Sequence, residues 1–581
     1  MTHLVFCFNA QKWNSVKPLH YFATHLEMHY DSIVCFYYVF NIYCTFIVEK
    51  KRYTIRILTG NCLIPTAQVL CIMVVNIICA GNPLYKIEEW LSDYTDGMGE
   101  IGNKANLFND DRCARSLDKL FDSDRASMMT RLAVTAMRVH ELMTNAIHND
   151  STSLTFKGQY KTSDLEAAKI CHGHNKDFRP DCKQVVFGLN ITNDGHVPLS
   201  YHLFDGNQTD DRTHIPNWES LRKLIGNEDF IYIADCKVCS AENLDYIHAH
   251  NGLFITIVPE NRKILRPFEQ RLLSDKVIWY KAYSVPDSRD KNKEVTYYFT
   301  EDEKTDSGYR LIWIKSDVKV EQDAARREKK IKKAENNLKD LSQKLNRHNL
   351  KTRKQIETAV SQTVKGCKNC ICVQIHEHST SVKKKISAGR PGPDSQYQTI
   401  HQHYYEIEFS RNEIAIKESA AMDGIFPLIT NTELTAPEVL RHYKEQPYLE
   451  KRFSTAKSVL EIAPMFLEKP KRIEAMVFLY FIALMVVSLI ERHVRKQMVT
   501  DNIEKLPILP QGMNTKKPTW NNIQYMFRNV HLSLTTRNQQ VISSQVKGLT
   551  ELHENLLKLL GVPAIFYNLL CDGWYDFERN R

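Results

Sequence analysis

A chain of 581 residues is too long for a single hydrophobic core and predicts two to four structural units. Its 43% hydrophobic and 25% charged residues are typical of a folded protein, which excludes collagen-like, wholly disordered and polytopic membrane classes. The net charge of +9 permits a nucleic-acid partner without requiring one.

The 15 cysteines follow no even framework and no cleavable signal peptide is recognisable ahead of them, so reduced thiols and a cytoplasmic location are expected. Three apolar stretches, 33–48, 67–80 and 476–490, are each shorter than the ~18 residues of a membrane span. No membrane partner is therefore expected. A membrane-attached or coiled-coil scaffold protein is retained as an alternative, mainly because of the first stretch.

The N-terminal third has two parts. Residues 1–64 show neither a helical nor an alternating period and are left unassigned, a spurious upstream extension being one interpretation. From residue 65 an apolar helix, an Asn-Pro break and two amphipathic helices at 85–93 and 110–124 predict a helical unit over 65–143.

Residues 144–259 alternate between strands and helices and predict the α/β class. The expected strands are 146–156, 185–191, 198–204, 230–234 and 253–258, with helices at 215–225 and from 240 to about 250. The order β-β-β-α-β-α-β favours a mixed sheet with covering helices.

Residues 260–415 interrupt this pattern with three aromatic-rich strands and a long charged helix. Its apolar residues recur every seven positions and predict a seam that packs against other helices: Ala324, Ile331, Leu338 and Leu345, with Ala334 and Leu341 between them. The basic residues of 326–333 favour a solvated face over a DNA contact. A loop is expected over 383–398, either a flexible linker or a minor-groove hook built on Arg390-Pro391.

The remaining chain is predicted to be helical. A long helix should begin at Thr435 and run past Lys457, and the apolar helix 476–490 should follow as core, within a segment spanning 416–498. The tail 499–581 should contain helices at 519–527 and 549–560, the second ending at Gly561.

Two aspartates stand where a sheet of this kind collects ligands. Asp150 lies among small polar residues of the first strand, and Asp235 ends the apolar strand 230–234. Carboxylates delivered to one sheet edge could share a divalent cation, although an aspartate that only caps a strand or helix is the more common arrangement.

The helix after Ala436 carries a candidate third carboxylate. Its polar residues are spaced 3, 4 and 7 apart, which places them on one helical face: Tyr443, Gln446, Glu450 and Lys457. Spacing alone is also compatible with an ordinary exposed helix.

These residues together resemble the catalytic elements of insertion-sequence transposases of the DDE class. The nearest branch has the helix signature Y-x2-R-x3-E-x6-K. Further similar stretches span roughly residues 65–570: 107–112, 117–120, 174–181, 183–189, 198–201, 204–207, 423–424 and 472–475.

The resemblance implies a ribonuclease-H-like core, here interrupted by the insertion 260–415 and resumed at 416–498. It implies two Mg²⁺ ions, replaceable by Mn²⁺, held by Asp150, Asp235 and Glu450. Two hard cations stabilise the entering and leaving oxygens of a phosphodiester under in-line attack. The enzyme would hydrolyse a strand at each element end and then join the freed 3′ hydroxyl to target DNA.

The resemblance also implies DNA contacts and partners. Tyr443 and Lys457 would touch phosphate near the cut, and Gln446 stands where the family has arginine, so a charged bidentate contact becomes a neutral amide. Arg452 lies on another helix face and does not replace that arginine. The expected partners are terminal inverted repeats, recognised by 65–143, target DNA, and a second copy of the chain, in the cytoplasm and nucleoid of a prokaryote.

Other patterns compete with this interpretation. Gln446 and residues 1–64 leave open a catalytically decayed or repurposed DNA-binding protein. One group of soft ligands could bind zinc but lacks the separated pair of a structural finger: Cys367, Cys370, Cys372, His376 and His378. Cys236 and Cys239 are interpreted as incidental thiols.

Overall fold

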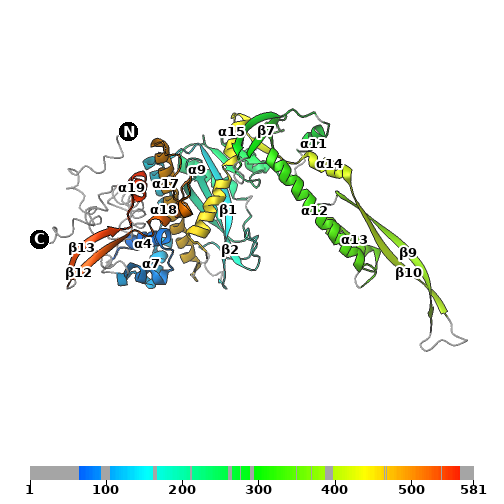
Figure 1. Ribbon diagram of the computed structural model, residues 1–581, viewed down its shortest axis with the longest axis horizontal. Coiled ribbons are helices and arrows are strands. Elements are labelled where there is room, and N and C mark those ends of the chain that lie inside the picture. Colours follow the sequence, from blue (N-terminus) through cyan, green and yellow to red (C-terminus); the bar gives the residue numbers. More distant parts are fainter. Residues whose placement is uncertain are drawn as a thin grey trace. The chain divides into compact units, whose positions relative to one another are not determined.

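The computed structural model describes most of the chain after residue 63 (Figure 1). The described residues are 64–92, 105–160, 166–209, 212–259, 265–274, 276–287, 293–347, 350–367, 369–386, 397–463, 465, 467–537 and 540–562. They fall into two compact units, one drawn from 1–255 with 442–581 and the other from 256–441. The apolar stretch 33–48 lies outside the described residues.

The first unit is built on a mixed sheet with the strand order β3-β2-β1-β4-β5. Its strands are β1 (Ala146–Phe156), β2 (Lys183–Thr192), β3 (Pro198–Phe204), β4 (Ile231–Ala234) and β5 (Leu253–Ile257). β2 pairs antiparallel with β1 and β3, while β4 pairs parallel with β1. The α/β class and the ribonuclease-H-like mixed sheet are confirmed.

A long apolar helix forms the other half of this core. Helix α17 (Pro470–Thr500) is buried around most of its circumference and packs on β3. By length and composition it could cross a membrane, with a window hydropathy of 2.5, but 83% of that window is buried. The burial identifies α17 as a core helix, as the flanking charged residues predicted.

Two helices of the N-terminal part pack against α17: α4 (Thr66–Cys79) and α7 (Asp110–Phe121). The same part contains α5 (Ile87–Ser92) and α8 (Arg125–Val139), and α8 packs on β3 and on the helix 214–225. Arg472 of α17 donates two hydrogen bonds of 2.7 Å to Asp118, and Arg125 donates one of 2.8 Å to Glu474. The similar stretches 117–120 and 472–475 thus meet in space as an ion-paired joint between α7 and α17.

Further helices complete the first unit: α9 (His214–Ile225), α10 (Ala241–Ala249), α18 (Trp520–Phe527) and α19 (Glu551–Leu560). The stop at Gly561 is confirmed, because this residue has φ 67° and closes α19 in the left-handed region that glycine tolerates. The tail is not purely helical, however. Strands β12 (His531–Arg537) and β13 (Gln540–Lys547) form a hairpin between α18 and α19.

The second unit has its own antiparallel strands in the order β11-β8-β7-β6. They are β6 (Tyr280–Pro286), β7 (Glu294–Glu301), β8 (Arg310–Ser316) and β11 (Ile425–Thr430), and α11 (Arg266–Leu273) and α14 (Glu413–Ala421) accompany them. The aromatic-rich strands were predicted, whereas β11 was not.

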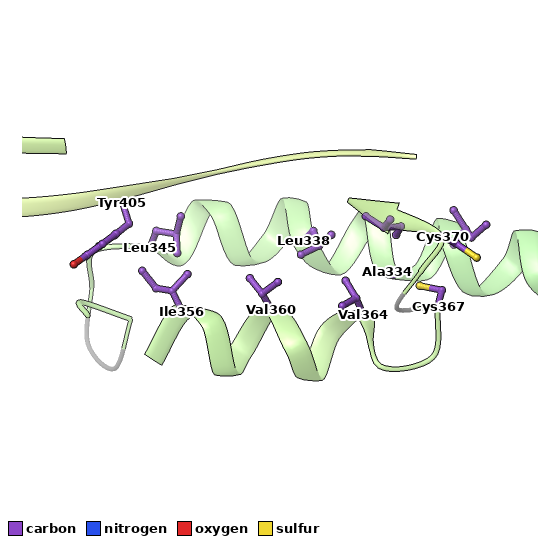
Figure 2. Close-up of a cluster of buried hydrophobic side chains, with 11 residues drawn as sticks. Ala334, Leu338, Leu345, Ile356, Val360, Val364, Cys367, Cys370 and Tyr405 are labelled. Carbon is purple, nitrogen blue, oxygen red and sulfur yellow. The ribbon is translucent and has the colours of Figure 1, made fainter. Parts of the chain in front are cut away.

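The predicted helical seam is present in the second unit. Helix α12 (Asp317–Lys344) buries Ile331, Ala334 and Leu338, and α13 (Arg353–Val364) covers them with its own apolar face (Figure 2). Ala324 at the start of the expected seam is only half-buried. The packing therefore uses the C-terminal half of the repeat.

The loop predicted at 383–398 is wrong at its two ends, where 383–385 and 397–398 belong to strands; residues 387–396 lie outside the described residues. Strands β9 (Ile371–Lys385) and β10 (Tyr397–Arg411) pair in register over 15 residues each. Their polar residues gave no strand signal, because the ribbon has little buried surface to impose an apolar alternation.

The single long helix predicted from Thr435 is also wrong. Helix α15 (Ala436–Lys444) ends before Pro447, which has no backbone N–H to donate, and α16 (Pro447–Ser454) begins at that proline. A π-helical turn, Thr455–Val459, follows directly and contains Lys457. Tyr443, Glu450 and Lys457 therefore lie on three different helical segments, and Gln446 lies in the turn between the first two.

A buried ion pair joins α16 to α17. Arg452 donates to Glu491 at 2.7 Å and to the carbonyls of His196 and Gly195 at 2.8 and 3.0 Å. Only 5% of Arg452 and 4% of Glu491 are exposed. Burial would raise the pKa of Glu491, but Arg452 and Arg495 hold it below its usual value, so the carboxylate stays charged.

We expect Arg452→Met to lower the free energy of unfolding of the first unit by ~3–5 kcal/mol, because Glu491 loses its closest cation while buried. Urea denaturation of the full chain measures this change. Arg115→Met is the matched control: Arg115 pairs with Asp111 on the surface of α7, where an ion pair contributes at most ~1 kcal/mol. Equal losses in the two variants would contradict the assignment.

Candidate active site

Asp150, in the middle of β1, and Asp235, directly after β4, lie near each other at the carboxyl edge of β4 in the first unit's sheet. The parallel register pairs Asn149 of β1 with Ala234 of β4, so the next residue on each strand is an aspartate. Burial raises the pKa of the Tyr232 phenol, and the carboxylates of Asp235 and Asp150 raise it further. The same two carboxylates add to the effect of burial on the Cys236 thiol, so both charges act on one small region.

A buried network of amides holds the strands beneath these aspartates. Asn149 donates to Asn190 of β2 at 2.8 Å, and Asn190 donates to Asn217 of α9 at 2.7 Å. Asn217 then donates to the Tyr232 hydroxyl of β4 at 3.0 Å. A satisfied polar network of this kind fixes one packing of its elements, here β1, β2, β4 and α9.

Gln446 connects the turn before α16 to β1. Its amide nitrogen donates to the carbonyl of Asn149 at 2.9 Å, and its oxygen lies 2.9 Å from Nδ1 of His148, the ring nitrogen that donates in the neutral imidazole. His148 is fully buried, and burial lowers its pKa to about 4. Both ends of Gln446 thus bind the strand that carries Asp150.

Glu450 and Tyr443 lie on either side of this connection. Tyr443 has a raised pKa, first because it is buried and then because of Asp235 and Cys236, so it remains a neutral hydroxyl near the aspartates. Glu450 is exposed one helical turn after Gln446, and a residue four positions on shares the same helical face.

Two lysines add positive charge along this edge. Lys457 donates to both oxygens of Asp177 at 2.8 Å. Lys176 donates to the backbone and hydroxyl oxygens of Ser151 at 2.8 Å, and its ammonium lies 3.6 Å from Asp150. Sequence reasoning included 174–181 among the similar stretches but gave Lys176 no role.

The carboxylates suit a hard divalent cation, since Mg²⁺ and Mn²⁺ prefer oxygen ligands. Asp150 and Asp235 share one edge and one electrostatic environment, which fits such an ion. Among the residues that the structure describes, no three His, Cys, Asp or Glu side chains are arranged as one metal-binding group. In the described part of the chain, Glu450 therefore does not form a three-carboxylate site with the two aspartates.

The cysteine patterns are accounted for by packing. Cys367 and Cys370 are buried in the apolar cluster between α12, α13 and β9 (Figure 2). His376 and His378 instead lie beside Glu408 and Glu406 of β10 at 3.2 and 3.8 Å. Cys236 and Cys239 are reduced thiols, and Cys239 is buried.

Two aspartates presented by adjacent parallel strands of a mixed sheet are compatible with metal-assisted phosphodiester chemistry. Residues 144–486 match the family model described as "Transposase DDE domain". The chain belongs to the transposase DDE domain family, whose members are DNA-cleaving and strand-transferring enzymes that generally use divalent metal ions. Residues 57–134 match a second model, described as "Domain of unknown function (DUF4277)".

Two solved transposase structures are similar to this chain at low identity. One is the Mos1 transposase paired-end complex with left transposon end (10% identity, 29% of this chain, TM-score 0.14), and the chain spans only 56% of that protein. The other is the cryo-EM structure of the piggyBac transposase synaptic complex with hairpin DNA (11% identity, 82% of this chain and 84% of that one, TM-score 0.24). No curated protein matches.

The neutral state of His148 predicts a pH dependence of stability. Its pKa falls from 6.5 to about 4 on folding, so the unfolded chain binds the proton first as the pH drops. The contribution of His148 therefore lowers the free energy of unfolding progressively as the pH falls from 6.5 to about 4. The loss reaches ~3 kcal/mol at the acid end.

We expect His148→Gln to flatten the dependence of the unfolding free energy on pH over that window. Denaturant unfolding at several pH values measures it, and His172→Gln, which removes an exposed histidine of the same unit, is the control. Identical slopes for wild type and His148→Gln would contradict the lowered pKa, because they would mean that His148 binds its proton at the same pH in the folded and unfolded chain.

Proposed function

We propose that the protein is a metal-dependent DNA transposase of an insertion sequence, in the branch with the Y-x2-R-x3-E-x6-K helix signature. The observation that supports this most directly is the pairing of β1 with β4, which places Asp150 beside Asp235 within the family's core domain. The reaction is hydrolysis of a phosphodiester at each element end, followed by attack of the freed 3′ hydroxyl on target DNA.

In this proposal Asp150, Asp235 and Glu450 hold two Mg²⁺ ions, for which Mn²⁺ can substitute. Such ions stabilise charge on the entering and leaving oxygens of an in-line displacement. The chain's own contribution is positioning: β1 and β4 carry the aspartates, and Gln446 ties the segment that carries Glu450 to β1. Glu450 would supply the third carboxylate to these ions.

Tyr443, Gln446 and Lys457 are proposed to lie along the DNA backbone next to the acids. Tyr443 stays protonated and can donate a hydrogen bond to phosphate, and Lys457 provides a point charge. Gln446 contributes less to the DNA than an arginine would, because its oxygen and one N–H are engaged with His148 and Asn149. Its main role in this proposal is to position α16.

The remaining assignments follow the same scheme. The unit 65–143 recognises terminal inverted repeats, the core of 144–259 with 416–498 carries out the chemistry, 260–415 is its insertion and 499–581 its tail. The active assembly is a homodimer that bridges two element ends, in the cytoplasm and nucleoid of a prokaryote.

Removing any of the three acids should abolish cleavage. We expect purified protein with a linear element end and Mg²⁺ to nick the boundary, and Asp150→Ala, Asp235→Ala and Glu450→Ala each to lower that rate by at least about a thousandfold. Denaturing gel electrophoresis of labelled DNA measures it. Asp229→Ala, an exposed acid just before β4, is the control. Nicking that survives all three changes would refute the assignment, and an inactive wild type that binds the ends would favour the decayed alternative.

Gln446 and Lys457 should have separable effects. We expect Gln446→Ala to slow nicking at least tenfold with little change in DNA affinity, because α16 loses its connection to β1 and small misplacements of reacting groups are costly. Lys457→Ala should weaken DNA binding itself and reduce its dependence on salt. Nicking kinetics at saturating DNA and binding titrations distinguish the two. A Gln446→Ala protein with full rate and weakened binding would place Gln446 on the DNA instead.

A further inference from the structure

The second unit carries a long two-stranded ribbon formed by β9 and β10. The strands pair from Arg411 with Ile371 at the base to Tyr397 with Lys385 at the far end. Strands in globular proteins average ~5–6 residues, and these have 15 each. Figure 1 shows the ribbon continuing well beyond the paired helices α12 and α13.

Only the base of the ribbon is supported by the unit's core. Ile371 and Tyr405 are buried in the cluster with α12 and α13, and the partly buried residues packed against that cluster include Val373, Ile375, Ile407 and Phe409 (Figure 2). Past Tyr405, every side chain of 378–384 and 398–404 is exposed. We name these two paired segments the outer ribbon.

An outer ribbon of this kind buries too little surface to be stable by itself, since an isolated two-stranded hairpin is marginal in water. Its exposed surface nevertheless includes apolar groups. Val382 and Ile400 are paired across the strands and are 42% and 37% exposed, and Tyr404 is 37% exposed. These residues indicate a surface that a partner covers.

Charge identifies the chemistry of that partner. The outer ribbon contains Lys383 and Lys384, both exposed, and neither segment contains an aspartate or glutamate. The ribbon's acids lie nearer its base, where they stand beside histidines: Glu377 with His403 at 2.8 Å, Glu408 with His376 and Glu406 with His378. Positive charge therefore increases toward the far end, which is complementary to a polyanion.

The dimensions of the outer ribbon match the major groove of duplex DNA. Paired strands lie ~4.8 Å apart and rise ~3.4 Å per residue, so each outer segment is roughly 24 Å long. A two-stranded ribbon enters the major groove, about 12 Å wide, whereas the minor groove is about 6 Å wide. One face of the outer ribbon presents Gln398 and Gln402 with the Val382–Ile400 pair. Carboxamides can read adenine edges and apolar groups can contact thymine methyls.

We propose that the outer ribbon is a DNA-binding arm that enters the major groove of duplex DNA, with Lys383 and Lys384 on the flanking phosphates. The proposal rests on the proposed function only in taking DNA as the substrate. The arm lies in the insertion, whereas the three acids lie in the other unit, so binding through the arm and cleavage can be measured separately.

The test removes the two charges without shortening the side chains. Full-length wild type and Lys383→Gln/Lys384→Gln are titrated with a mixed-sequence duplex in EDTA, between about 50 and 200 mM salt. We expect the slope of log K against log salt to become shallower by about 1.8, since each phosphate contact contributes ~0.9. Methylation of guanine N7 in the major groove should be protected by wild type and less protected by the variant.

Two controls isolate the arm. Lys351→Gln/Lys354→Gln removes two exposed lysines at the start of α13 in the same unit and should leave the slope unchanged. Lys383→Arg/Lys384→Arg should restore it, because the charge is kept. All variants should melt like wild type, since none alters a buried residue.

The outcomes discriminate between partners and between proposals. An unchanged slope and unchanged N7 protection in Lys383→Gln/Lys384→Gln would overturn the DNA-binding arm. If Lys383→Gln/Lys384→Gln leaves DNA binding unchanged but lowers the oligomeric mass of the DNA-free protein in sedimentation, the ribbon binds a second copy of the chain. That result would also overturn the DNA-binding arm. Asp150→Ala should keep the wild-type slope, so failure of the cleavage assay leaves this test unaffected.

Discussion

The parallel pairing of β1 with β4 is the constraint on which the site depends. Side chains alternate between the faces of a strand, so a slip of one residue would turn Asp150 away from Asp235. Backbone hydrogen bonds alone do not choose between registers. The buried amides do, because Asn149, Asn190 and Asn217 satisfy one another only when β1, β2 and α9 are held as observed. An interior polar network thus determines where two surface carboxylates meet.

The departure at Gln446 has a physical counterpart in His148. A buried imidazole with a pKa of about 4 is neutral, and a neutral carboxamide is a suitable partner for it. A guanidinium at the same place would bring a charge against an uncharged, buried group that cannot accept from it while Nδ1 carries the proton. Gln446 and His148 therefore form a matched pair, which explains the glutamine within the fold without invoking decay.

Much of this site was accessible from sequence because its strands are buried. The strands 146–156 and 230–234 follow from the sequence pattern, and they locate Asp150 within β1 and Asp235 directly after β4. The break at Pro447 and the π-helical turn at Lys457 were missed because a face-spacing argument assumes a continuous helix. The proximity of Lys176 to Asp150 depends on how a loop folds back along β1, which no local pattern specifies. The exposed ribbon of β9 and β10 was missed for lack of buried alternation.

The local ion pairs near the site matter more for its electrostatics than the protein's net charge of +9 does. Lys457 is held by Asp177 and Lys176 lies near Asp150, each on partly exposed side chains. Exposed ion pairs contribute at most ~1 kcal/mol, so exchanging Asp177 for the DNA phosphate of the proposed function would cost Lys457 little. Separating the buried Arg452–Glu491 ion pair costs far more than separating an exposed one. This pair therefore holds α16 in place against α17.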